Sequence, residues 1–399
     1  MKAFEESYIG NCRLTNRIVR SATYEGACSP DGIPGNDYFK MYSELSAGKP
    51  GLIITGFVHV APDGKAMQNA QGGFDNHEKA MLYKKITDEV HRNGSKIFIQ
   101  LAHTGRQTIN ERVQKVRGAS SKASPYFKSK PETLSTSEIK EIINQFAQSA
   151  KWAKEAGFDG VQVHAAHGYL IHQFLLPAIN NRKDIFGIDE KTRLGTAFLQ
   201  SVIEKIRIDC GDDFPVILKI SGSADGKLAF SEQQYIHLIQ FINTINVDAL
   251  EISYGTMDVA LNIIRGDIPL DLILKINPFY KGHGKIYNTL WKVLAAPVIK
   301  RQIKSFSSKY NIKYALIARE HTKLPIISVG GYRNLDDINE AINAGIDYVS
   351  MCRPFICEPD IVKKIQENLH YKSKCINCNF CSVMCDSGKI TKCYKFKNK

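Results

Sequence analysis

Residues 325–351 read PIISVGGYRNLDDINEAINAGIDYVSM and hold one complete strand–helix–strand unit. An apolar run at 325–329 opens the unit and a second run at 348–351 closes it. Between them, Asn334 or Asp336 is suited to cap the start of a helix, and Ala344-Gly345 to end it. Apolar strands that alternate with helices pair in parallel and are covered on both faces. The stretch therefore predicts a parallel α/β sheet.

The same pattern recurs along the chain. Further apolar runs lie at 18–22, 52–58, 97–101, 160–164, 216–221 and 249–253. Helix starts lie between them: Ser135-Thr136-Ser137-Glu138 opens a long helix, and Ser231 precedes Gln234 by the spacing of a capping box. Eight such runs favour a closed barrel over an open doubly wound sheet. We expect an α/β protein, a parallel (β/α)8 TIM barrel over residues 1–369.

Two stretches depart from a minimal barrel. Residues 256–310 are too long for a simple loop after the sixth strand and contain three prolines, so we expect a helical excursion from the C-terminal face. Such an insertion covers an active site or makes an oligomer contact, and the sequence leaves both open. Residues 370–399 form a short C-terminal extension with five of the ten cysteines, too poor in core residues to fold alone.

Composition narrows the class of partner. With 43% hydrophobic and 23% charged residues the chain is not disordered. The net charge of +13 first raises nucleic acid as a partner, but the lysines are scattered and no nucleic-acid motif is present, so a basic rim that attracts anionic ligands is favoured. No signal peptide and no apolar run of about eighteen residues is found, which predicts a cytoplasmic protein without a membrane partner. A homo-oligomer stays open.

Chemistry-bearing side chains follow the predicted strands, where barrel enzymes carry their active sites. His164 ends the fourth run, and His167 and Tyr169 follow it. Paired imidazoles can donate hydrogen bonds to a carbonyl oxygen or oxyanion, and a phenol can deliver a proton. A metal site is the alternative for the two histidines, but carboxylate partners are missing nearby. Structural burial of the histidines is the other alternative.

Further candidate residues indicate a ligand-binding site. Gln100, near the end of the third run, can pair with the edge of a heterocycle, and Lys219, in the fifth, is either a cation beside a reduced flavin or half of a buried ion pair. Gly330-Gly331 and Cys352-Arg353 follow the seventh and eighth runs, where barrels bind phosphate through backbone N–H groups and arginine. The residues alone therefore indicate a phosphorylated ligand without identifying it.

The motifs together are similar to those of a known family. They are Gln100-Leu101-x-His103-x-Gly105-Arg106, His164-Ala165-Ala166-His167-Gly168-Tyr169-Leu170, Asn181-Arg182-x-Asp184-x-Phe186-Gly187, Gly330-Gly331 and Cys352-Arg353-Pro354. On these residues, nearly the whole barrel resembles the Old Yellow Enzyme family of NADH:flavin oxidoreductases, and the FMN barrel of 2,4-dienoyl-CoA reductases in particular.

The resemblance implies an FMN enzyme that takes hydride from NAD(P)H and transfers it from reduced flavin to an activated C=C bond of the enoate or enone type. His164 and His167 would bind the activating oxygen and Tyr169 would donate the proton. FMN would be held by Ala22, Thr23, Gly56, Gln100, Lys219, Gly330, Gly331, Cys352 and Arg353. Two positions depart from the family: Tyr24 stands where Cys or Thr often tunes the flavin, and Lys219 where Arg is common.

The extension has its own motif, Cys375-x2-Cys378-x2-Cys381-x11-Cys393, with Cys385 as a further cysteine. Thiolates at such spacing bind iron–sulfur clusters or zinc, and free thiols are the third alternative. Longer members of the resembled family carry a 4Fe-4S cluster here, with one more residue between the second and third cysteine. The alternative function is therefore a flavin/iron–sulfur protein that donates electrons to a protein partner. No Gly-x-Gly-x-x-Gly follows a strand, so we expect nicotinamide to meet the flavin directly.

Overall fold

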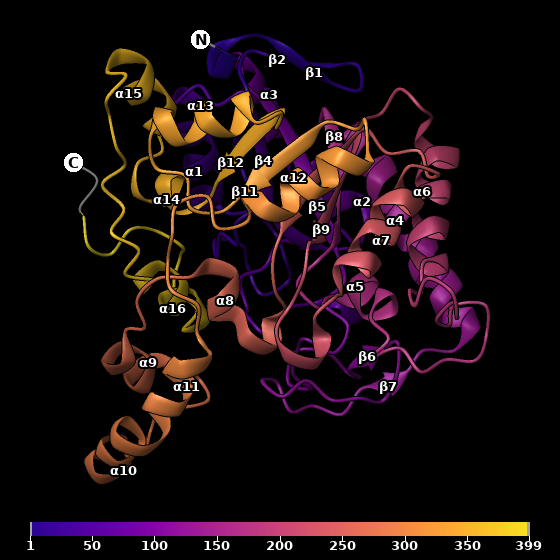
Figure 1. Cartoon of the computed structure of the whole chain (residues 1–399), viewed down its shortest axis with the longest axis vertical. Helices are drawn as coiled ribbons and strands as arrows, with labels where there is room; N and C mark the ends of the chain where they lie inside the picture. The colour runs from indigo at the N-terminus through magenta and orange to yellow at the C-terminus, as the bar shows by residue number, and fades with distance from the viewer. Residues whose placement is uncertain (1, 397–399) are drawn as a thin grey trace.

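The computed structural model describes residues 2–396, and its central strands close into a parallel barrel (Figure 1). In chain order these strands are β3 (Ile18–Arg20), β4 (Leu52–His59), β5 (Lys96–Ala102), β8 (Gly160–Ala165), β9 (Val216–Ser221), β10 (Ala249–Ser253), β11 (Ile326–Val329) and β12 (Tyr348–Met351). The last strand pairs with the first, with Val349 opposite Ile18. The predicted (β/α)8 barrel is confirmed, and each of the eight apolar runs overlaps one of its strands.

Helices surround the barrel: α1 (Asn36–Ala47), α3 (Lys84–Arg92), α4 (Thr136–Glu155), α6 (Ala197–Cys210), α7 (Glu232–Ile242), α12 (Ile312–His321), α13 (Leu335–Asn343) and α15 (Ile361–Glu367). Their starts follow from capping chemistry. Ser135 and Ser231 each form a full capping box. Asn334, rather than Asp336, caps α13 by accepting the Asp337 N–H over 2.8 Å.

The N-terminal end of the barrel is filled with apolar side chains. The short helix η1 (Lys2–Phe4) leads into the hairpin of β1 (Ser7–Ile9) and β2 (Cys12–Leu14), which covers this end (Figure 1). Ile9 and Leu14 of the hairpin share one buried cluster with Val19, Phe98 and Ile217 of the strands. Because this end is sealed by burial of apolar surface, polar groups inside the barrel can only be reached from the C-terminal face.

The C-terminal face carries the longer connections, opposite the hairpin (Figure 1). They contain η2 (Pro62–Gly64), α2 (His77–Met81), β6 (Arg117–Gly118), β7 (Glu132–Thr133), α5 (Leu170–Leu175), η3 (Gly226–Leu228) and α14 (Arg353–Cys357). The excursion after β10 holds η4 (Met257–Val259), α8 (Ala260–Ile264), α9 (Leu270–Ile276), α10 (Lys285–Leu290), the π-helix η5 (Trp291–Ala295) and α11 (Ala296–Gln302). The cysteine-rich tail adds α16 (Phe380–Asp386). Among residues 2–396, no helix combines the length and apolar character needed to cross a bilayer.

Candidate active site

The motif at the end of β8 brings its two histidines and its tyrosine together. The ring centroids of His164 and His167 are 4.9 Å apart, and those of His164 and Tyr169 are 4.8 Å apart. Phe57 from β4 lies 5.3 Å from Tyr169, centroid to centroid, and closes one side of the cluster. The three candidate catalytic side chains are therefore neighbours at the C-terminal end of the barrel.

Hydrogen bonds decide which ring nitrogens can face a ligand. The Ala166 N–H donates to Nδ1 of His164 over 3.2 Å, so a neutral His164 carries its proton on Nε2. Nε2 of His167 lies 2.8 Å from the Ser253 hydroxyl oxygen. When that hydroxyl donates, the His167 proton is on Nδ1. Each ring then keeps one N–H for a ligand.

Burial sets the charge of this cluster. Burial, reinforced by the nearby Lys219, lowers the pKa of His164 well below the ordinary histidine value, and burial followed by His164 and Lys219 does the same to the pKa of His167. Burial raises the pKa of the Tyr169 phenol. At neutral pH the cluster therefore consists of two uncharged imidazoles and a protonated phenol.

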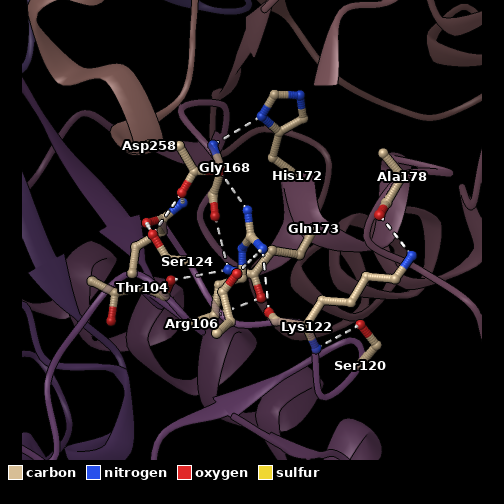
Figure 2. Close-up of polar contacts among 12 residues, drawn as sticks. Thr104, Arg106, Ser120, Lys122, Ser124, Gly168, His172, Gln173, Ala178 and Asp258 are labelled. Carbon is tan, nitrogen blue, oxygen red and sulfur yellow. Dashed lines mark hydrogen bonds and ion pairs between the residues drawn. The ribbon is translucent and has the colours of Figure 1, made fainter. Parts of the chain in front are cut away.

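The turn that follows His167 is held from behind by a polar network (Figure 2). His167 itself adopts the left-handed backbone region, with φ of 60°. The Gly168 N–H donates to Nδ1 of His172 over 2.9 Å, and Gln173 donates from Nε2 to the carbonyls of Gly168 (2.8 Å) and Thr104 (3.1 Å). These buried bonds fix a strained turn, as a site that must hold its geometry requires.

A buried ion pair extends this support to the excursion. Nη2 of Arg106 lies 2.5 Å from Oδ2 of Asp258, and the Ser124 hydroxyl donates to Oδ1 of the same carboxylate over 2.6 Å (Figure 2). Arg106 follows β5 and Asp258 follows β10. The motif after β5 therefore positions its neighbours, since Arg106 is occupied by Asp258 and by the carbonyls of Lys122 and Ala123.

The buried histidines predict a loss of stability in acid. Burial lowers the pKa of His172 to about 3, whereas an unfolded histidine titrates near 6.5. Above pH 6.5 both states are neutral and the stability is intact, but below it the unfolded chain binds a proton that the folded chain does not. At pH 5 this histidine should cost about 2 kcal/mol of the free energy of unfolding.

His172→Asn tests this linkage, because asparagine retains an acceptor for the Gly168 N–H. Urea unfolding at pH 7.5 and pH 5 should show a pH dependence smaller by about 2 kcal/mol in this variant than in the parent. An equal pH dependence in the two proteins would rule out His172 as a source of acid sensitivity.

The barrel interior beneath the site holds a closed polar network. Nζ of Lys219 lies 3.0 Å from Oε2 of Glu251 and 3.1 Å from the Ser21 hydroxyl. Gln162 donates to Oε2 of Glu251 over 2.8 Å, and Gln100 donates to Gln162 over 2.7 Å. Lys219 is therefore in a buried ion pair. The lysine also lies at the level of His164 in the neighbouring strand, and its role beside a flavin stays a prediction.

Removing the Glu251 charge should be strongly destabilising. Glu251→Gln leaves the Lys219 ammonium without a counter-ion in the barrel, at an expected cost of about 3–5 kcal/mol in the free energy of unfolding. The double variant Lys219→Met, Glu251→Gln should lose less than Glu251→Gln alone, because it leaves no unpaired charge. Urea unfolding of the parent, of Lys219→Met and Glu251→Gln alone, and of the double variant measures the difference, and a double variant as unstable as the sum of the two single losses would contradict the pairing.

The residues expected at the flavin edge lie around the end of β3 and a bulge in β4. The β4–β5 register shifts between Ile54 and Phe57, and this shift frees the Gly56 N–H from the ladder. In the structure that N–H donates to Oε1 of Glu25 over 2.6 Å. A Cβ on Gly56 would lie 2.5 Å from the Thr23 carbonyl oxygen, so Ala22, Thr23 and Gly56 share one tight corner.

Gly330 and Gly331 form a cradle that only glycine can build. Their φ angles are 126° and 92°. A Cβ would lie 2.6 Å from the Tyr310 ring at Gly330 and 2.6 Å from the Ser307 carbonyl oxygen at Gly331. The segment that enters α12 therefore packs against the cradle, and Cys352-Arg353 at the start of α14 lies beside it.

Three guanidinium groups gather at this cradle. Arg353 donates from Nη1 to the carbonyl of Arg265 (2.7 Å) and to Asn379 Oδ1 (2.7 Å), while Arg353 and Arg333 flank the Phe306 ring at 5.8 and 5.1 Å. Nε of Arg333 and Nε of Arg265 are buried without a hydrogen-bond partner, and in the described chain no carboxylate pairs with any of the three. Buried cations without a counter-ion favour an anion, so these residues fit a phosphate group.

The tail cysteines also converge. One cavity is lined by the four predicted ligands together with Cys357 of α14: Cys357, Cys375, Cys378, Cys381 and Cys393. Cys385 lies outside this lining. Within residues 2–396, no three His, Cys, Asp or Glu side chains are arranged around a common point as ligands of one metal ion. The structure therefore brings the four thiols to one cavity without forming a coordination shell.

Among the residues of the site that were not predicted are Glu251, Ser253, Arg265 and Arg333. Glu251 stands as a lone carboxylate inside an apolar strand, and the β9–β10 register sets it directly opposite Lys219. Arg333 follows the glycine pair by two positions. A lone charge in a buried strand and a cation next to a phosphate cradle are signals that the sequence carries.

Barrel enzymes with a phosphorylated ligand bind the phosphate after their last two strands. In this chain Gly330-Gly331 and Cys352-Arg353 lie at those positions, and two imidazoles lie at the end of the fourth strand. A profile of the NADH:flavin oxidoreductase / NADH oxidase family matches residues 2–265 and 283–372. The chain belongs to this family. The resemblance to Old Yellow Enzymes and the expectation of an NAD(P)H flavin oxidoreductase are thereby confirmed, with FMN and a nicotinamide reductant as the family's cofactors.

Individual relatives agree with this assignment. The chain is 26% identical over 396 residues to the 4,4'-dithiodibutanoate disulfide reductase of Rhodococcus erythropolis, covering 98% of this chain and 94% of the relative. It is 28% identical over 393 residues to the NADH oxidase of Thermoanaerobacter brockii, covering 97% of this chain but 54% of that longer relative.

The solved structure of an old yellow enzyme homologue from Zymomonas mobilis has the same fold, with a TM-score of 0.69 and 22% identity over 95% of this chain and 96% of that one. The relatives do not favour the alternative of an electron-transfer protein.

Proposed function

We propose that this chain uses FMN and NAD(P)H to reduce the C=C bond of activated alkenes of the enone or enoate type. The observation that carries the proposal is the group of two neutral imidazoles and a protonated phenol at the end of β8. Neutral N–H donors can stabilise the negative charge that develops on an oxygen during a reaction, and they bring no charge of their own to the site. A buried phenol with a raised pKa keeps its proton until a strong base forms beside it.

The residues that would hold FMN form an arc on the C-terminal face. The phosphate would be bound at the cradle, and the ring system above the polar network of the barrel. These residues are Ala22, Thr23, Gly56, Gln100, Lys219, Gly330, Gly331, Cys352 and Arg353. We add Arg333, because its Nε is buried without a hydrogen-bond partner. When bound, FMN would accept hydride from the nicotinamide and transfer it to the alkene.

The protein side chains then have separate tasks. His164, through Nε2–H, and His167, through Nδ1–H, would donate hydrogen bonds to the activating oxygen of the alkene. Tyr169 would hold the proton that the α-carbon receives. The Lys219–Glu251 pair keeps the floor of the site close to neutral, so that the two imidazoles dominate the stabilisation of the substrate oxygen.

Anaerobic absorbance and turnover assays test the proposal. We expect the protein to take up FMN, to become yellow, and to oxidise NADH or NADPH at a rate that depends on added cyclohexenone. 4,4'-Dithiodibutanoate is the second substrate to assay, because the Rhodococcus relative is named for its reduction. The proposal would be contradicted by a protein that stays colourless with FMN, or by one whose rate of NADH or NADPH oxidation does not change when the alkene is added.

We further propose that Cys375, Cys378, Cys381 and Cys393 hold an iron–sulfur cluster. Their common cavity and their spacing support this assignment. Iron, acid-labile sulfide and zinc are to be measured after anaerobic purification. Iron with sulfide is the expected result, zinc alone would indicate a structural zinc site, and the absence of all three would indicate free thiols.

A further inference from the structure

The excursion after β10 contains a continuous helix that stands away from the barrel. In this outer helix (residues 285–302), α10, η5 and α11 follow one another without a break. Figure 1 shows the excursion projecting from the barrel on the side away from the N-terminal hairpin, with α10 farthest out. No residue of α10 or η5 is buried, and Ala296 is the one buried residue of α11. Packing within the protein therefore does not account for the apolar residues of the outer helix.

Apolar side chains of the outer helix form an exposed row. The row consists of Ile286 (80% exposed), Leu290 (54%), Leu294 (66%) and Val298 (55%). These residues are spaced by four, a spacing that drifts around a regular α-helix by about 40° at each step. The π-helical turn of η5 has more residues per turn, and it offsets part of this drift, so the four side chains share one face. Val293, next to the row, is exposed as well.

The charges around this row have one sign. The sequence contains no aspartate or glutamate between Asp271 and Glu320. Asp271 itself pairs with Lys292 of the outer helix. Four further cations of this region are exposed: Lys281, Lys285, Lys300 and Arg301. The outer helix therefore combines an exposed apolar row with a surplus of positive charge at both of its ends.

This combination matches the surface of an anionic membrane. A helix that lies on a bilayer buries its apolar face at the headgroup boundary, while lysine and arginine beside that face contact anionic headgroups. Trp291 and Tyr280, whose ring centroids are 5.3 Å apart, belong to the residue types enriched at this boundary. A second copy of the chain could also cover the row, but two like faces would bring their cations together. The charge distribution therefore favours lipid over a second copy.

We propose that the outer helix docks this protein on the surface of anionic lipid membranes. The expectation of no membrane partner was based on the lack of an apolar run of about eighteen residues, which a spanning helix needs and a helix at the surface does not. Each lysine or arginine close to an anionic surface raises the affinity about fivefold, and each apolar side chain of the row adds to it by leaving water. Binding therefore depends on anionic lipid and weakens in high salt.

Sedimentation with lipid vesicles tests this contact on the full-length protein. The probes are vesicles of phosphatidylcholine alone and vesicles in which phosphatidylglycerol makes up about a third of the lipid. We expect the protein to sediment with the anionic vesicles, to bind the neutral ones at least about tenfold more weakly, and to be released by high salt. Trp152→Phe leaves Trp291 as the one tryptophan. Its emission should then shift to shorter wavelength with anionic vesicles, because the indole leaves water.

Two double variants separate the two parts of the contact. Leu290→Ser with Leu294→Ser removes the centre of the apolar row and leaves the charge unchanged. Lys281→Gln with Lys285→Gln removes two cations and leaves the row intact. Each pair of substitutions should lower the affinity for anionic vesicles about tenfold or more. Since all four side chains are exposed, the free energy of unfolding should change little.

Ile185→Ser with Ile208→Ser is the matched control, because these two isoleucines are as exposed as the row but lie elsewhere on the surface. This variant should bind vesicles as the parent does. A parent that does not sediment with anionic vesicles, or double variants that bind them as tightly as the parent, would overturn the proposal. So would a dimer, measured by analytical ultracentrifugation, that Leu290→Ser with Leu294→Ser abolishes while no vesicles are bound, since a second copy would then cover the row.

Discussion

Replacing both Arg333 and Arg353 by methionine is expected to weaken FMN binding on the order of a thousandfold, because a charge-assisted hydrogen bond contributes about 1.5–3 kcal/mol. The two guanidinium groups flank Phe306 beside the Gly330-Gly331 cradle and lack carboxylate partners in the described chain. Their charge is therefore available to a phosphate. Without it, the ring of FMN would be held mainly by the amides and backbone groups at the other end of the arc.

Titration of the apo-protein with FMN, followed by quenching of flavin fluorescence, measures this loss. Arg319→Met is the matched control, because its guanidinium is paired with Asp347 at 2.8 Å and its charge is already balanced. A double variant that binds FMN within about threefold of the parent would show that the phosphate lies elsewhere.

The barrel was predictable because its signal is local. Each strand is a short apolar run, each helix start is marked by a capping residue such as Ser135 or Asn334, and the number of repeats decides between an open sheet and a closed one. The hairpin that seals the N-terminal end was not predicted. Its strands are three residues long, and what stabilises them is burial against the barrel rather than any pattern within residues 7–14.

The same difference between local sequence signals and long-range contacts applies to the site. His164, His167 and Tyr169 could be predicted as a group because they lie within six positions at the end of one strand. Glu251 could not be assigned to Lys219 in this way, since the pair depends on the register of β9 against β10. The hydrogen bonds of Asp386 in α16 with Gln68 and Asn277 could not be predicted either, because these partners lie more than a hundred residues away in the sequence.

The two ends of the arc differ in how their charges are balanced. At the barrel centre, Lys219 is neutralised by Glu251, and the site above it is left with uncharged imidazoles. At the cradle, Arg265, Arg333 and Arg353 have no carboxylate among the residues described. A ligand with a dianionic phosphate at one end and an uncharged ring system at the other matches this distribution, and a ligand that is anionic throughout does not.

His164→Ala combined with His167→Ala should lower kcat/KM for cyclohexenone roughly a thousandfold, because removal of a preorganised donor to a developing oxyanion typically costs a factor of about 100–1,000 and the two donors act on one oxygen. Reoxidation by dioxygen, which needs no donor to a carbonyl oxygen, should change little. Both rates are to be measured by anaerobic stopped flow on protein first reduced with NADPH, with His77→Ala, a half-exposed histidine on α2, as the control. If the enone and dioxygen rates fall together, the histidines act on the flavin environment instead of on the substrate, and the assignment of His164 and His167 as its oxygen-binding pair is wrong.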